Sequence, residues 1–142
     1  MPLPEHDLSE WPIVVVTWPK GKITDSEFPV YLDNLSAHHG HGGRFARVMD
    51  VRASGALSAH ERRQLAERLD SDEAKYPGQL VAMAVVTSTI FQRGIFKALA
   101  WLYSKPQRRE AFSNLEDAKR WAWMQLAGRD TSVPQQDLSG QR

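Results

Sequence analysis

Four short segments, three of them largely apolar, predict the strands of a sheet. These segments are residues 11–18, 45–51, 80–87 and 109–112. The first is rich in β-branched and aromatic residues, as buried strands are, and Pro12 stands near its start, where a missing N–H does least harm. The third is apolar at every position but its last, which is typical of a central parallel strand. The fourth is short and polar and predicts an edge strand.

Each predicted strand is followed by a segment with apolar residues at helical spacing. The four helices are expected within residues 24–39, 58–72, 88–105 and 113–128. Strands that alternate with helices predict an α/β sandwich with a four- to five-stranded, largely parallel sheet and about four helices. A further strand near the N-terminus would supply the fifth.

The start of the first helix has two solutions. Thr24 and Glu27 have the spacing of a capping box, but Pro29 would then remove one intrahelical hydrogen bond. Ser26 as the cap would instead place Pro29 in the first turn, where no hydrogen bond is lost. Both starts remain open at this point.

Length and composition bound the organisation of the chain. Its 142 residues correspond to one domain, which we expect at 11–128, with an N-terminal extension at 1–10 and a disordered tail at 129–142. No cysteine is present, which excludes disulfides, thiolate metal sites and cysteine nucleophiles. The 18 basic and 17 acidic residues leave a net charge of +1, far below the excess of a general polyanion binder. We therefore expect no binding to nucleic acid. No segment is typical of a signal peptide or a membrane span, so we also expect a cytoplasmic protein.

Histidines are the first candidates for chemistry. His38, His39 and His41 lie in a glycine-rich turn, and imidazoles at this density can bind Zn, Ni or Cu ions. A catalytic zinc site would also need a placed carboxylate, and the turn supplies none. The favoured interpretation is therefore a solvated helix end. Ser58 and His60 do not face each other at a spacing of two, so no Ser–His dyad is expected. No metal and no cofactor is predicted.

Polar side chains also gather where the predicted strands end. Ligands of open α/β sheets bind beyond the carboxyl ends of the strands. The candidates for a partner-binding surface there are Asp50, Arg52, Ser54, Ser58, Ser88 and Arg93. The favoured structural interpretation is that the hydroxyls cap helices and that Asp50 pairs with an arginine or a loop amide.

Two tryptophans are candidate interface residues. Trp121 fits the apolar stripe of the last helix, but Trp123 lies near the opposite face, and Trp101 lies off the stripe of the preceding helix. Exposed tryptophans often mark an interface, and a homodimer is one such use. The alternative is that each tryptophan covers a neighbouring loop.

Four motifs in this order resemble the SpoIIAA-like, or STAS-like, domains of bacteria. They are TDSEF at 24–28, VMDVR at 48–52, AVVTSTIFQRG at 84–94 and EAFSNLEDAKRWAWMQL at 110–126. The resemblance implies an α/β fold without a cofactor. The best-known members bind a partner kinase and are switched by phosphorylation of a serine at the start of the second helix. That position is Ala59 here, so the resemblance does not extend to the phosphoswitch.

Three functions follow as hypotheses. The leading one is a non-enzymatic bacterial regulatory or protein-interaction module that binds a protein partner and is not switched by the usual serine phosphorylation. The alternative is a domain that binds a small apolar ligand or lipid near Phe91 and Trp101, which a distant relation to CRAL-TRIO domains also suggests. The third is a hydrolase or metal enzyme that uses the histidines of the glycine-rich turn or His60.

Overall fold

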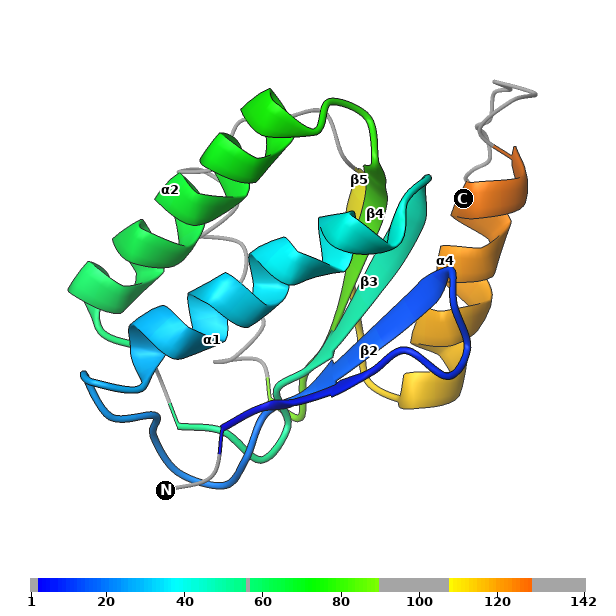
Figure 1. Cartoon of the computed structure of the whole chain (residues 1–142). Helices are drawn as coiled ribbons and strands as arrows, with labels where there is room; N and C mark the ends of the chain where they lie inside the picture. The colour runs from blue at the N-terminus through cyan, green and yellow to red at the C-terminus, as the bar shows by residue number, and fades with distance from the viewer. Residues whose placement is uncertain (1–2, 56, 90–107, 129–142) are drawn as a thin grey trace.

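A five-stranded sheet forms the centre of the computed structural model, which describes residues 3–55, 57–89 and 108–128 (Figure 1). The strands are β1 (Glu5–Asp7), β2 (Ile13–Thr17), β3 (Phe45–Asp50), β4 (Leu80–Val86) and β5 (Arg108–Phe112). They lie in the sheet in the same order as in the chain. β1 is antiparallel to β2, and every other neighbouring pair is parallel. The prediction of a largely parallel α/β sheet is therefore confirmed.

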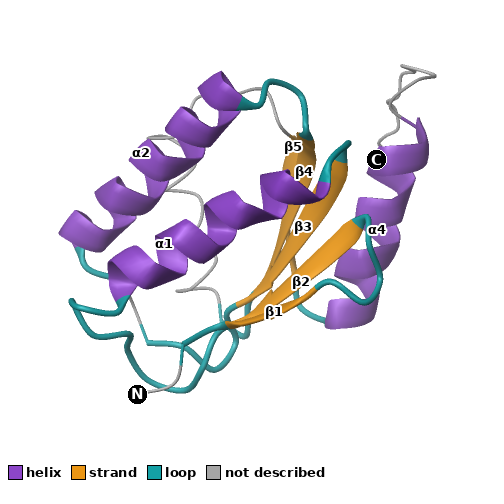
Figure 2. Cartoon of the chain, viewed as in Figure 1, coloured by secondary structure: helices purple, strands orange, loops and turns teal. Residues whose placement is uncertain are grey.

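Helices cover both faces of this sheet (Figure 2). They are α1 (Phe28–Ser36), α2 (Ala59–Lys75) and α4 (Leu115–Gly128), and the 3-10 turn η1 (Ala37–His41) follows α1. The chain steps from β2 to β3 to β4 in one direction, so right-handed crossovers place α1 and α2 on the same face. α4 packs on the other face, against β3, β4 and β5. The remaining predicted helix, within residues 88–105, lies almost wholly outside the described residues.

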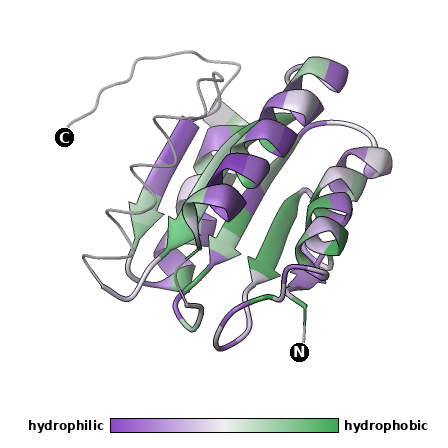
Figure 3. Ribbon diagram, turned by 90° about the vertical axis from the view of Figure 1, so that its left-hand side faces the viewer, coloured by the Kyte–Doolittle hydropathy of each residue, from purple (hydrophilic) through white to green (hydrophobic). Residues whose placement is uncertain are grey.

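Alternation along the strands divides the apolar residues into two cores. Figure 3 shows hydrophobic residues along the central strands and many hydrophilic ones on the helices that cover them. Val14 and Val16 of β2 face α1 and α2, whereas Ile13 and Val15 face α4. Of the ten buried residues described on the α4 side, five are alanines: Ala46, Ala82, Ala84, Ala118 and Ala122. Because these side chains are short, the helix backbone lies close to the sheet.

The first helix begins at neither of its two predicted caps, because its N-cap is Glu27. Thr24 and Glu27 make the contacts of a capping box: the Glu27 amide donates to Thr24 Oγ1 at 3.3 Å and the Thr24 amide donates to Glu27 Oε1 at 3.4 Å. These contacts close a turn ahead of the helix. The helix itself begins at Phe28, which leaves Pro29 in the first turn without loss of a hydrogen bond. Ser26 is not the cap.

The N-terminal segment contributes the additional strand that the sequence allowed. Glu5, His6 and Asp7 pair with Thr17, Val16 and Val15 along the outer edge of β2. The predicted tail at 129–142 lies outside the described residues.

The close approach of α4 gives a test of this packing. We expect Ala122→Leu to lower the free energy of unfolding by about 1–3 kcal/mol, because the added atoms have no space against the sheet. Ala127→Leu is the matched control, since Ala127 is exposed on the same helix. Urea unfolding of both variants measures the difference. Equal midpoints for the two variants would contradict the tight contact.

Candidate functional site

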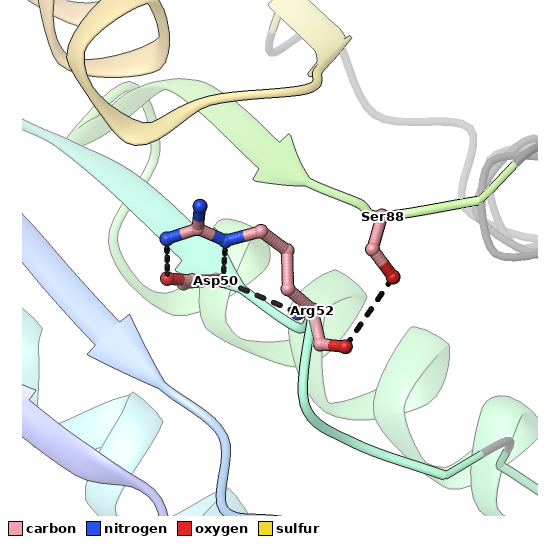
Figure 4. Close-up of polar contacts among 3 residues, drawn as sticks. All are labelled: Asp50, Arg52 and Ser88. Carbon is pink, nitrogen blue, oxygen red and sulfur yellow. Dashed lines mark hydrogen bonds and ion pairs between the residues drawn. The ribbon is translucent and has the colours of Figure 1, made fainter.

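The carboxyl end of β3 carries a closed ion pair. Asp50 is the last residue of the strand, and Arg52 turns back over it (Figure 4). Arg52 Nε donates to Asp50 Oδ1 at 2.9 Å, and a terminal guanidinium nitrogen donates to Oδ2 at 2.7 Å. The Arg52 amide adds a third hydrogen bond to Oδ1 at 3.2 Å. The pair has the two-pronged geometry that fixes a guanidinium in one orientation.

Burial and pairing shift the pKa of Asp50 in opposite directions. Removal from water tends to raise the pKa of Asp50, but the hydrogen bonds and charge of Arg52 outweigh it and hold that pKa below its usual range. The carboxylate is 11% exposed, whereas the Arg52 side chain is 40% exposed. Asp50 is therefore the anchor, and Arg52 presents its remaining surface to solvent.

The loops after β2 and β3 are joined by backbone contacts. The Gly55 amide donates to the Gly21 carbonyl at 2.7 Å, and Gly21 also forms an isolated bridge with Ser54. A Cβ at Gly55 would lie 3.2 Å from Cγ of Lys22 and 3.4 Å from the Gly21 carbonyl oxygen. The Ser54 hydroxyl donates to the Val51 carbonyl at 3.0 Å within the second loop. The two loops therefore hold each other in place.

The start of α2 closes the same region. The Glu61 amide donates to Ser58 Oγ at 3.0 Å, and the Ser58 amide donates to Glu61 Oε1 at 2.9 Å. This reciprocal capping box confirms Ser58 as a helix cap. Lys22 Nζ lies 3.9 Å from the buried Glu61 carboxylate and ties the first loop to the helix. Among the contacts of the described residues, no hydrogen bond joins Ser58 to His60.

The structure thus brings most of the predicted surface to one edge of the sheet. The Ser88 hydroxyl, just beyond β4, donates to the Arg52 carbonyl at 3.4 Å. We call Asp50, Arg52, Ser54, Ser58 and Ser88 the carboxyl rim. Arg93 lies outside the described residues. Sequence reasoning missed Lys22 and the Gly21–Gly55 contact, because a contact between loops leaves no periodic signal.

The histidines of η1 are not the solvated helix end that the sequence predicted. His38 and His39 are only 2% and 4% exposed, so that interpretation is wrong for both. The turn folds back onto the sheet, where the His39 ring packs edge-on to Phe45 and stacks on Tyr76. His41 is exposed and lies against Trp11. Among the described residues, no three histidine or acidic side chains are placed to hold a metal ion.

Two predicted aromatic sites have different outcomes. Trp123 is 44% exposed beside Met124, and Trp121 packs on Phe112, as their positions on the helix predicted. A role of Trp123 in an interface stays a prediction. Trp101 and Phe91 lie outside the described residues, so the apolar-ligand hypothesis also stays a prediction.

Comparison with known proteins assigns the fold. An uncharacterised protein of the DUF3478 family from Shewanella loihica PV-4, whose crystal structure is described as SpoIIAA-like, superposes with a TM-score of 0.58. The alignment covers 84% of this chain and 91% of that protein at 16% sequence identity. The chain therefore has a SpoIIAA-like fold. No family model and no curated protein matches the sequence.

Within the part of the chain that the structure describes, no helix combines the length and apolarity required to cross a bilayer.

The Asp50–Arg52 pair makes stability depend on pH. We expect Asp50→Asn to lower the free energy of unfolding by about 1 kcal/mol at pH 7, because a charge-assisted hydrogen bond at a partly exposed arginine is replaced by a neutral one. The lowered pKa of Asp50 means that this contribution is present above the ordinary aspartate value of 3.8 and is lost as the pH falls further.

Urea titrations at pH 7 and pH 3 measure the effect, with Asp33→Asn on the exposed Arg68 pair as the control. The difference between wild type and Asp50→Asn should shrink in acid. A difference that persists unchanged at pH 3 would show that the charge of Asp50 contributes no stability.

Proposed function

We propose that this chain is a non-enzymatic, protein-binding regulatory module that docks a partner protein on the carboxyl rim. The partner contacts the exposed face of Arg52 and the two joined loops on either side of it. The compartment in which it works is the bacterial cytoplasm.

The observation that carries the proposal is an exposed arginine held in a fixed orientation. Two of its nitrogens are bound to Asp50, and the adjoining loop is tied to Gly21 and to the Ser54 side chain. A surface that is already ordered loses little conformational entropy on binding. Arginine is also among the residues that most often dominate interface energetics. A fixed, exposed arginine on a rigid rim therefore suits recognition of a protein.

The start of α2 supports a partner contact that is not switched by phosphorylation at the usual position. Ala59, the first residue of the helix, has no hydroxyl group to accept a phosphate. The Ser58 hydroxyl is already engaged by the Glu61 amide. A phosphate on Ser58 would stand beside the Glu61 carboxylate, whose charge repels it.

Ala53 offers a direct test. It is exposed in the rim loop between Arg52 and Ser54, so Ala53→Arg adds bulk to the proposed contact without removing the Asp50 pair. Tagged protein purified from its source cells would be used to identify a partner. Titration calorimetry with the purified partner should then give at least roughly 10-fold weaker binding for Ala53→Arg.

Arg120→Glu is the matched control. Arg120 lies on α4, over the other face of the sheet, and its side chain is 68% exposed and pairs only with Asp117 in the contacts described. The affinity of Arg120→Glu for the partner should equal that of wild type. Equal affinities for wild type and Ala53→Arg, or a loss with Arg120→Glu alone, would place the partner elsewhere and refute the carboxyl rim as the docking surface.

A further inference from the structure

A row of polar side chains crosses the core beneath β1. Arg47, in the middle of β3, is fully buried, and its Nε and a terminal nitrogen both approach Nδ1 of His38, at 3.2 and 3.1 Å. Nε2 of His38 lies 2.7 Å from Nδ1 of His6. His6 is the central residue of β1, so the row ends at the edge strand of the sheet.

The guanidinium group fixes where every proton in this row lies. Arginine can only donate, so His38 Nδ1 accepts and carries no hydrogen. A neutral His38 then carries its hydrogen on Nε2 and donates it to His6 Nδ1. His6 in turn carries its hydrogen on Nε2, a buried atom without a hydrogen-bond partner in the described residues. The contact between β1 and the core therefore requires a neutral His6.

Protonation of His6 would reverse this contact. A hydrogen on Nδ1 would face the N–H of His38 across 2.7 Å, so two donors would meet without an acceptor. The added charge would also lie near the permanent charge of Arg47. Consistent with this geometry, burial and then the charge of Arg47 lower the pKa of His6 to about 4 and that of His38 to about 2.

The other groups around His6 do not offset this charge. Tyr31 of α1 faces the His6 ring, with centroids 6.1 Å apart, and burial raises the pKa of the Tyr31 hydroxyl, so it stays neutral. Among the described residues, His38 of η1 also contacts the His6 ring, and the charge of Arg47 of β3 acts on it. Glu5 and Asp7, its neighbours in β1, are exposed, as their alternation along the strand requires.

We propose that His6 is an acid-sensitive latch for β1. The neutral ring holds β1 on the edge of the sheet through His38, and protonation releases β1 and uncovers the edge of β2. β1 is suited to this because it is only three residues long and, within the described sheet, pairs with β2 alone. The inference is independent of the proposed partner and of the carboxyl rim.

Hydrogen exchange at the amides of Glu5–Asp7 tests the latch in the full chain. Protection factors, corrected for the intrinsic effect of pH, should fall roughly 20-fold between pH 7 and pH 5 if released His6 regains its ordinary pKa of 6.5 from a value of about 4. The amides of β4, in the middle of the sheet, should keep their protection. Equal behaviour of β1 and β4 would overturn the proposal.

Two variants separate the latch from a general effect of acid. In His6→Gln the amide oxygen can accept from His38 but cannot be protonated near neutral pH, so β1 protection should not change with pH. His60→Gln removes an exposed histidine from α2 and should behave as wild type does. If the protection of the β1 amides in His6→Gln fell between pH 7 and pH 5 as much as in wild type, the role of His6 would be refuted.

A second measurement covers the case in which His6→Gln fails to hold β1 at either pH. Nitrogen-15 NMR of the wild-type imidazoles should show His38 protonated on Nε2 alone at pH 7, and His6 titrating well below the ordinary range. A His38 ring with its proton on Nδ1, or a His6 that titrates at 6 or above, would overturn the latch.

Discussion

The burial of Arg47 is the constraint on which one half of the molecule depends. A guanidinium group remains charged at any ordinary pH, and an unsolvated charge in a protein core is costly unless acceptors surround it. Here the acceptors include the Leu35 carbonyl near the end of α1 and the His38 ring, and the Phe45 ring lies 5.5 Å away. A carbonyl at the C-terminal end of a helix carries partial negative charge and suits a cation. One side chain of β3 thus joins the end of α1 and the turn η1 to the sheet.

The two ends of the parallel strands are built differently. At the amino ends, apolar and aromatic packing dominates, with Trp11 stacked on Phe45 and His39 stacked on Tyr76. At the carboxyl ends, the loops are held by hydrogen bonds and by the Asp50–Arg52 pair. This division is usual for open α/β sheets, where the connections at the carboxyl ends are available for binding while the rest of the sheet supplies stability.

The fold was predictable because it follows from local periodicity. Strand and helix patterns alternate, and the capping-box spacing of Ser58 and Glu61 predicts the start of α2. The buried histidines were not predictable in the same way, since spacing does not tell whether a glycine-rich turn faces solvent or folds inward. Arg47 did leave a signal: it shares a strand face with Phe45 and Met49, two core residues, so a buried cation with nearby acceptors could have been inferred. The role of His6 could not be predicted, because its contact with His38 arises only from the pairing of β1 with β2.

A contiguous set of contacts joins the latch to the carboxyl rim. His6 faces Tyr31, the Tyr31 ring packs edge-on to Trp18, and the Trp18 amide donates to the Asp50 carbonyl at 2.9 Å. Spatial continuity alone does not couple two sites; coupling needs an element with two arrangements that both sites bias. The Trp18–Asp50 bond extends the pairing of β2 with β3, and the Gly21–Gly55 contact joins the loops that follow those strands. β1 takes part in neither contact: it pairs with Val15–Thr17 of β2, and Glu5 lies opposite Thr17, the residue in register with Asp50. Release of β1 therefore removes no contact that holds the rim loops together.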